Sequence, residues 1–301
     1  MNTLTELTAE TTDDIIMPPV ITAPRQGDDF KIGTGFEALA YRNDDFSGTM
    51  DPLVMVDHYK MSKPTFGAHP HAGLSAVSVI LEDSEGPFHN RDSLGNNFDI
   101  MPGDLYWLKA GSGVIHDESP RPGSNIHGLQ VFVNLPAELR RSTPKSLHVK
   151  AQDMPRLEGK DYSVRLVLGD SNGCSGQQSP ALPMTILDGK VEKAGKFTHQ
   201  LKGGENAWIT LINGEATITV RGKKTSLKAG QAITVSELLT TITTEIHLTN
   251  SGKGTSHFVL FAGKPINEAY VQKGPFIMGS EAEIAEIEAD YIAGKLGKLK
   301  D

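Results

Sequence analysis

The feature that most constrains the fold is a regular succession of short apolar runs separated by turn residues. Between about residues 20 and 136, four runs have the length and composition of β-strands: LVMVDHY, LSAVSVILE, DLYWLKA and GLQVFVNL. The segments between them have the residues that turns favour, namely EDSEGP, DSLGNN, MPGD and GSG. Strands at such even spacing predict an antiparallel barrel or sandwich.

A second β-rich block follows a polar connector at residues 137–150. It contains two runs in which apolar and polar residues alternate, one before and one after Asn213-Gly214, a dipeptide that favours a tight hairpin. Both blocks have a strand, a turn, a strand and then a glycine turn, MPGD at 101–104 and LKAG at 227–230. We therefore expect an all-β chain with two barrels of one type in tandem, and a hairpin at Asn213-Gly214.

The two ends of the chain differ from these blocks. The first residues, MNTLTELTAETTDDIIMPP, lack the positive start and apolar run of a signal peptide and predict a loose acidic tail. Near the other end, Ser280 and Glu283 have capping-box spacing, and Ile284, Ile287 and Tyr291 recur at helical spacing. The expected domains are a flexible tail at 1–20, a first domain at 21–140, and a second at 141–301 that ends in a helix packed against a barrel.

Charge and cysteine content limit the partners and the compartment. The net charge of -8 argues against direct binding of nucleic acid, which needs a basic face. The single cysteine, Cys174, cannot form an internal disulfide, and we interpret it as an exposed loop thiol. No apolar run approaches the roughly 20 residues of a membrane span. We expect a cytoplasmic protein, or a nuclear one in a eukaryote, without membrane or nucleic-acid partners.

Two pairs of potential metal ligands stand out. His69 and His71 flank Pro70 in FGAHPHAG, and His116 and Glu118 are two apart in GSGVIHDESP. Residues two apart in a strand share one face, and Pro70 favours extended backbone at a sheet edge. On facing strands the pairs would bring three imidazoles and one carboxylate into one barrel, a set that suits iron, zinc, copper, nickel or manganese. A surface or structural role is the alternative for either pair.

Longer motifs resemble the signature of the pirin family of bicupins: MDPLVMVDHYK, HPHAG, RDSLGN, MPGDLYWLKAGSGVIHDE, HGLQVFVNL and YVQKGPFIMGSEAEI. The resemblance implies two tandem cupin barrels, each a double-stranded β-helix or jelly roll, with a C-terminal α-helix. It also implies a metal site in the first barrel, normally Fe(II), with His69, His71, His116 and Glu118 as ligands. The second barrel would have no metal site, and His199 stands alone at the corresponding position.

Some positions depart from the family pattern. After HPH the family usually has Arg-Gly-Phe-Glu, whereas this chain has Ala72, Gly73, Leu74 and Ser75. Groups around a metal site tune the metal, so substrate range or redox potential is expected to differ from typical members. The histidine that the family has before RDSLG is Asn90 here, and we assign no role to its neighbour His89. The remaining histidines are interpreted as surface or structural residues: His58, His127, His148, His247 and His257.

Three functions are compatible with such a site. Neutral imidazoles and one glutamate leave a divalent cation with net positive charge, which favours an anionic substrate oxygen. The resemblance implies an oxidoreductase of the quercetin 2,3-dioxygenase type that acts on a flavonol and dioxygen, with Glu118 as catalytic base. The alternative is an iron-binding transcriptional cofactor that binds a protein partner in one redox state. A binding protein without chemistry is the third, and the missing Arg and Glu after HPH favour the last two.

Overall fold

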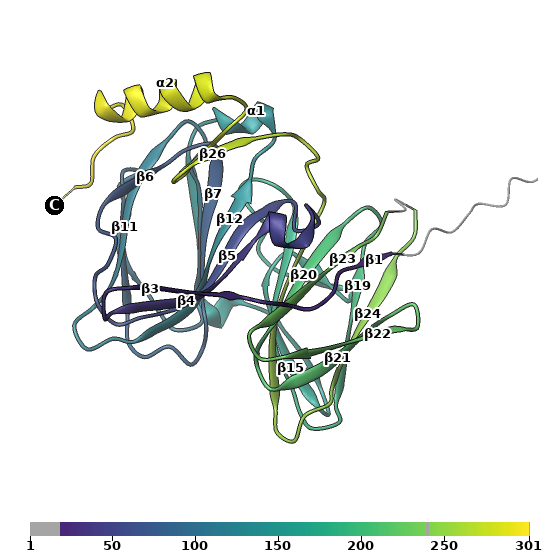
Figure 1. Cartoon of the computed structure of the whole chain (residues 1–301). Helices are drawn as coiled ribbons and strands as arrows, with labels where there is room; N and C mark the ends of the chain where they lie inside the picture. Colours follow the sequence, from purple (N-terminus) through teal and green to yellow (C-terminus); the bar gives the residue numbers. More distant parts are fainter. Residues whose placement is uncertain (1–18, 239–240, 301) are drawn as a thin grey trace, which may run out of the picture.

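The computed structural model describes residues 19–238 and 241–300, which form two antiparallel β-barrels side by side (Figure 1). In the first barrel a seven-stranded sheet faces a four-stranded sheet across an apolar interior. The large sheet has the order β13 (Lys145–Val149), β10 (Leu105–Lys109), β7 (Leu74–Ile80), β12 (Ile126–Asn134), β5 (Leu53–Met61), β4 (Phe36–Arg42) and β3 (Asp28–Ile32). The small sheet has the order β6 (His69–His71), β11 (Val114–Pro120), β8 (Phe88–Asp92) and β9 (Asn97–Ile100).

The second barrel repeats this plan. In its large sheet β1 (Val20–Ile21) and β2 (Arg25–Gln26) both pair with β23 (Gln231–Ser236), and β20 (Asn206–Asn213), β25 (Ser256–Gly263), β18 (Met184–Val191), β15 (Tyr162–Leu168) and β14 (Arg156–Gly159) follow. Its small sheet has the order β19 (Lys196–Leu201), β24 (Thr244–Asn250), β21 (Glu215–Val220) and β22 (Lys223–Lys228). Short elements connect these strands: η1 (Asn43–Phe46), α1 (Ala137–Arg140), η2 (Ala151–Asp153), β16 (Asp170–Ser171) and β17 (Cys174–Ser175). The predicted all-β class with two tandem barrels is confirmed.

The large sheets of the two barrels pack against each other. In β5, Met55, Asp57 and Tyr59 face the interior of the first barrel, whereas Val56 faces the second barrel. This alternation follows from strand geometry, and it explains why the sequence of β5 is almost continuously apolar. One cluster of buried side chains therefore spans both barrels, including Val56, Trp107 and Val131 from the first and Val167, Trp208 and Phe261 from the second.

Arg165 of β15 supports this interface with charge. Its guanidinium is 1% exposed, donates to Asp188 at 2.5 Å within its own barrel, and donates to the carbonyl of Gly103 in the first barrel at 2.6 Å. Burial opposes the ionisation of Asp188, but the hydrogen bond from His257 and the charge of Arg165 outweigh it and hold its pKa below the usual range.

The predicted hairpin at Asn213-Gly214 is wrong. β20 ends at Asn213 and pairs with β23 and β25, whereas β21 begins at Glu215 and pairs with β22 and β24 in the other sheet. The chain thus changes sheets at Gly214, and the hairpin lies at Arg221-Gly222, where both residues have positive φ. An Asn-Gly dipeptide supplies the backbone conformation of a tight turn but does not determine which strands pair.

The C-terminal segment returns to the first barrel. β26 (Val271–Lys273) and β27 (Phe276–Met278) precede α2 (Glu281–Ile292), which lies over β6 and β11 at the top of Figure 1. Ser280 caps α2 by accepting a hydrogen bond from the Glu283 N–H, and Ile284 and Ile287 are buried, as predicted. Tyr291 is 39% exposed, so the buried face of the helix is shorter than its spacing suggested.

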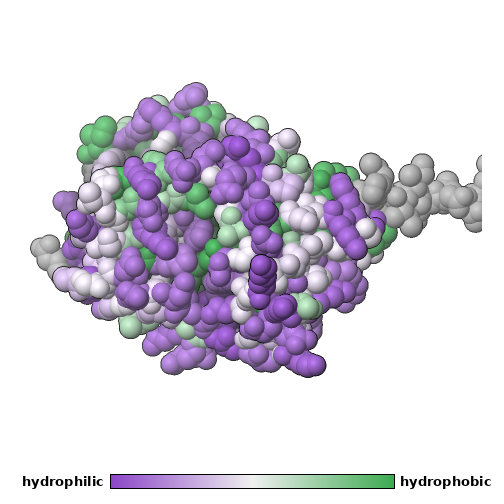
Figure 2. All heavy atoms as spheres, turned by 60° about the horizontal axis from the view of Figure 1, so that its bottom comes forward, coloured by the Kyte–Doolittle hydropathy of each residue, from purple (hydrophilic) through white to green (hydrophobic). Residues whose placement is uncertain are grey.

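Strand pairing therefore crosses the predicted domain boundaries. β1 and β2 pair in the second barrel, β13 pairs with β10 in the first, and α2 packs on the first barrel. Residues 1–18 of the predicted acidic tail lie outside the described residues. Within the described part, no helix is long and apolar enough to cross a membrane. The face shown in Figure 2 is mostly hydrophilic, with apolar residues in small separate groups.

We expect Arg165→Met to lower the free energy of unfolding by about 3–5 kcal/mol, measured by denaturant titration. The substitution leaves the carboxylate of Asp188 buried without its arginine partner and the carbonyl of Gly103 without its donor.

Arg156→Ala is the matched control. Arg156 of the second barrel pairs with Glu82 of the first across the same interface, but both side chains are substantially exposed, at 41% and 33%. Because exposed ion pairs contribute little, the control should cost about 1 kcal/mol or less. Equal losses in the two variants would contradict a special role for the buried arginine.

Candidate metal centre

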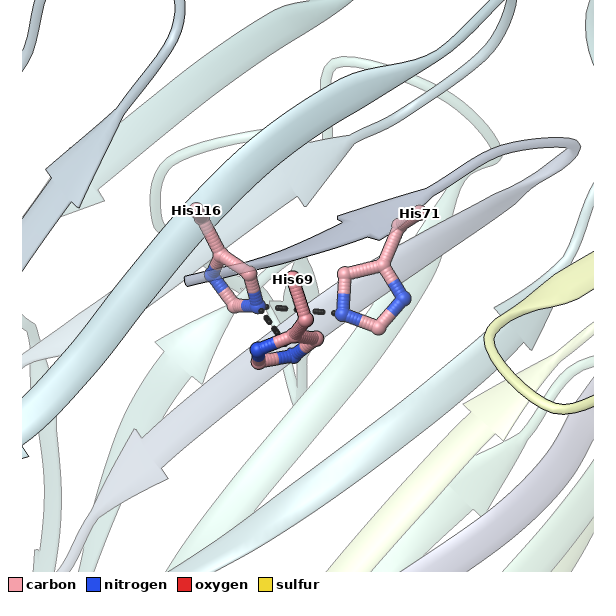
Figure 3. A group of neighbouring side chains, drawn as sticks. All are labelled: His69, His71 and His116. Carbon is pink, nitrogen blue, oxygen red and sulfur yellow. Dashed lines mark hydrogen bonds between the residues drawn. The ribbon is translucent and has the colours of Figure 1, made fainter. Parts of the chain in front are cut away.

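Two neighbouring strands of the small sheet bring three histidines together. β6 pairs with β11 so that His69 lies opposite His116 and His71 lies opposite Val114. Because His69 and His71 are two residues apart in a strand, both side chains point to the same face as His116. Figure 3 shows the three rings converging, with the Nε2 of His116 at 3.0 Å from that of His71 and 3.1 Å from that of His69.

Backbone carbonyls determine which ring nitrogens face inward. The Nδ1 of His69 donates to the carbonyl of Gly67 at 2.8 Å, and the Nδ1 of His71 donates to that of Pro275 at 3.3 Å. With the hydrogen on Nδ1, the Nε2 atoms of these two rings each present a lone pair toward the Nε2 of His116. The Nδ1 of His116 has no partner among the described residues, so its Nε2 can either donate to one of these lone pairs or, without a hydrogen, join them around a cation.

Burial keeps the imidazoles neutral. It lowers the pKa of His71 to about 3, with a further contribution from His69, and it lowers the pKa of His116 well below the ordinary value. Metal ligands must be deprotonated, so these rings are ready to bind at neutral pH. Bonds of about 2.0–2.1 Å at right angles place two nitrogens about 3 Å apart, which matches the Nε2 separations. The three histidines therefore fit a first-row transition metal.

Glu118 lies in the same interior but is not part of the converging group. Its ligand atoms are outside the cluster that the three histidines form. One carboxylate oxygen, Oε2, accepts a hydrogen bond from Ser78 at 2.8 Å, and Oε1 is buried without a partner among the described residues. Burial raises the pKa of Glu118 to about 7, an effect that Ser78 opposes and Asp117 and Asp92 reinforce. A carboxyl group with this pKa can gain or lose a proton near neutral pH.

The histidines open onto a cavity of about 230 Å³. Most of its walls are apolar or aromatic, and its polar side chains are Asp57, Glu118 and Gln130. The apolar walls come from four strands, the loop before β6 and the segment around Gly274-Pro275: Phe36, Met55, Tyr59, Met61, Phe66, Phe88 and Phe132. A cavity of this composition favours a flat apolar ligand with a few oxygens.

The other histidines all have partners of their own. His58 and His127 contact each other through Nε2 at 2.7 Å. The rest bind hydroxyl, amide or carboxylate groups: His89 to Asn97, His148 to Asp104, His199 to Ser171, His247 to Thr198 and His257 to Asp188. Among the described residues, the histidines of the second barrel form no group comparable to the cluster in the first.

The departures from the family pattern lie beneath the C-terminal segment. Ala72 is fully buried and forms a bridge with Phe276, and the Oγ of Ser75 is buried without a partner among the described residues. Gly73 has φ of 73°, and a Cβ there would lie 1.7 Å from the carbonyl oxygen of Ile277. The HPHAG segment is thus shaped to admit the returning chain.

Asn90 is fully buried opposite Glu118 in the small sheet.

Sequence reasoning missed three contributors to the site. Ser78 and Gln130 belong to runs that read only as buried strands, and their position beside Glu118 depends on how β7 and β12 pair. Pro275 is about 200 residues from the histidine that it contacts, so no local pattern could reveal it. A polar residue within an apolar run was the one available signal for Ser78 and Gln130.

Residues 35–133 match the family model described as Pirin, and residues 186–297 match that described as Pirin C-terminal cupin domain. The chain belongs to the pirin family. Pirin of Rattus norvegicus is 30% identical over 249 residues, which cover 82% of this chain and 83% of the rat chain. The predicted family is confirmed, and so are its two cupin domains.

Solved structures give the same fold. A quercetin 2,3-dioxygenase from Acinetobacter baumannii is 26% identical, with a TM-score of 0.80 over 94% of this chain and 99% of that chain. The bacterial pirin YhhW from Escherichia coli, solved in complex with nickel(II), is 19% identical, with a TM-score of 0.58 over 82% of this chain and 100% of that chain. At that identity the second likeness shows the fold alone.

We expect the purified protein to hold close to one transition-metal ion per chain, measured by elemental analysis after reconstitution with Fe(II). His71→Ala removes one of three converging lone pairs and should lower metal affinity by more than the roughly 10–100-fold typical of losing a supporting group.

His89→Ala is the control, since His89 lies in the same small sheet but is bonded to Asn97 away from the cluster. It should keep the metal content of the wild type. Equal metal content in all three proteins would show that the histidine cluster is not the binding site.

Proposed function

We propose that this member of the pirin family is a metal-dependent dioxygenase that acts on flavonols, with Fe(II) held by His69, His71, His116 and Glu118. The observation that carries the proposal is the convergence of three imidazoles on an aromatic-walled cavity. The similarity to the quercetin 2,3-dioxygenase of Acinetobacter baumannii supports the reaction class. Nickel, manganese, copper and zinc suit the same ligands, and nickel(II) is bound in the E. coli pirin.

The charge of the site favours an enolate. Three neutral imidazoles add no charge and a glutamate removes one unit, so a divalent cation would retain a net positive charge of one unit. When bound, such a cation lowers the pKa of a hydroxyl that coordinates it. The 3-hydroxy-4-oxo group of a flavonol supplies a hydroxyl of this kind beside a carbonyl oxygen.

Glu118 is suited to accept the proton of that hydroxyl once its carboxylate has left the metal. Its Oε1 has no partner among the described residues, while Ser78 holds Oε2 and fixes the orientation of the carboxylate. Because burial raises its pKa to about 7, the carboxylate is a stronger base than an ordinary glutamate and still ionises near neutral pH.

The aromatic walls bind and shield the ring system. Phe132 packs edge-on against His71, and Phe66 lies near His69, with ring centroids 5.1 and 6.4 Å apart respectively. Phe66 also packs edge-on against Phe36 at 5.1 Å, although it is 49% exposed. Phe66 thus stands at the mouth of the cavity, where a bound flavonol would cover it and exclude water from the reacting oxygens.

We expect the Fe(II)-loaded protein to consume dioxygen when quercetin is added, measured with an oxygen electrode. Glu118→Gln keeps the shape of the side chain and an acceptor for Ser78 but cannot take a proton. It should lower kcat by about 10²–10⁴-fold, the usual contribution of a general base.

Glu245→Gln, an exposed position in the second barrel, is the control and should leave kcat unchanged. The metal content of each variant is measured in the same samples, so that loss of metal is distinguished from loss of the base. If no loaded metal supports dioxygen consumption, the dioxygenase proposal fails, and iron-dependent binding of a protein partner becomes the function to test.

A further inference from the structure

The hydroxyl of Tyr59 has no structural use that the described residues reveal. Tyr59 lies in β5, is 3% exposed, and lines the cavity that contains the histidine cluster. Its hydroxyl oxygen is buried and has no hydrogen-bond partner among the described residues. A buried hydroxyl without a partner destabilises a fold, so its presence needs another explanation.

Packing alone holds the ring of Tyr59 in place. Phe36 stacks on it, with ring centroids 5.7 Å apart and an interplanar angle of 17°, and Phe88 lies 6.4 Å away. Gly128 is opposite Tyr59 in the sheet, and a Cβ at Gly128 would lie 3.2 Å from the hydroxyl oxygen. A phenylalanine ring would fit the same space. Packing of the ring therefore does not explain why this residue is tyrosine and has a hydroxyl group.

The cavity contains complementary polar atoms without partners. Tyr59 offers an O–H donor and Glu118 offers the acceptor Oε1, and both are buried beside the histidine cluster. Burial, reinforced by the negative charge of Glu118, raises the pKa of Tyr59 well above its ordinary value. The phenol therefore stays protonated and serves as a hydrogen-bond donor.

Other polar groups of the cavity are already engaged. Asp57 accepts a hydrogen bond from Arg42 at 2.7 Å, and the side-chain amide of Gln130 donates to the carbonyl of Val77 at 3.4 Å. Tyr59 is the one residue with a hydroxyl group in the cavity lining of the described structure, and this hydroxyl is free to donate.

We propose that Tyr59 is a substrate-binding residue that donates a hydrogen bond to the enolate or carbonyl oxygen of a ligand held at the histidine cluster. This inference rests on the proposed function and adds a specificity determinant to it. The donor favours α-hydroxyketone ligands that bind as anions, because a hydrogen bond to a charged acceptor is roughly twice as strong as one to a neutral acceptor. Glu118 would take the proton, and Tyr59 would stabilise the oxygen that remains.

The test compares wild type and Tyr59→Phe in anaerobic titrations of the Fe(II)-loaded proteins with 3-hydroxyflavone, followed by absorbance. Without dioxygen the ligand is bound but not consumed. We expect Tyr59→Phe to raise Kd about tenfold and to shift the absorption band of the bound flavonolate. Flavone, which has no 3-hydroxyl group, should bind the two proteins equally. Without ligand, the variant should unfold at the same temperature as wild type or higher.

Tyr41→Phe is the matched control. Tyr41 is also fully buried, but its hydroxyl donates to the carbonyl of Gly230 at 2.7 Å, between the barrels. This variant should lose stability and keep the wild-type affinity for 3-hydroxyflavone.

Three results would overturn the inference. Equal affinity and an unchanged spectrum in Tyr59→Phe would do so while leaving the dioxygenase proposal intact. A loss of stability in unliganded Tyr59→Phe as large as that in Tyr41→Phe would show a structural role for the hydroxyl. If the loaded wild type binds no 3-hydroxyflavone, the proposed function fails, and the role of Tyr59 fails with it.

Discussion

The candidate site depends on burying imidazoles in the neutral form. Removing His71 and His116 from water costs too much for either ring to carry a proton, so their nitrogens remain available as ligands. Two backbone carbonyls then fix the rings of His69 and His71 with Nε2 inward, one from the loop before β6 and one from Pro275. Desolvation keeps these rings neutral, and the backbone carbonyls determine that Nε2 is the nitrogen that faces inward. Neither would suffice alone, because an exposed or freely rotating imidazole would not converge with its neighbours.

This requirement explains why the C-terminal segment returns to the first barrel. The segment around Pro275 faces His71, and the packing of Ala72 against Phe276, Met278, Ile284 and Ile287 covers the strand that carries the histidines. Gly73 allows the close approach, since any side chain there would meet the carbonyl of Ile277. The last 30 or so residues are therefore structural parts of a site whose proposed ligands lie roughly 150 to 200 residues earlier.

Local patterns predicted what depends on neighbours in sequence. The spacing of two in HPH and in HDE placed the two residues of each pair on one face of their own strand, because strand periodicity fixes that geometry. The pairing of β6 with β11 then brings the two pairs to one side of the sheet. The Ser280 cap and the buried Ile284 and Ile287 followed in the same way from helical spacing. The predictions that failed, and the contacts that were missed, depend on pairing between segments far apart in the sequence. Asn213-Gly214 has hairpin chemistry, yet its two strands belong to different sheets. The partners of Glu118 and His71 likewise come from strands and segments that no local pattern connects.

The second barrel has a physical part in the site although it lies away from the histidines. Packing against it buries the outer face of β5 and β12, the strands whose inner faces present Tyr59, Gln130 and Phe132 to the cavity. A strand buried on both faces has little freedom to move, and a binding group is useful only when its position is held closely. The charges of Arg165 and Asp188 strengthen the same interface. Loosening that interface would thus displace the cavity wall opposite the histidines before it disturbed the histidines themselves, since these lie in the small sheet on the other side of the barrel.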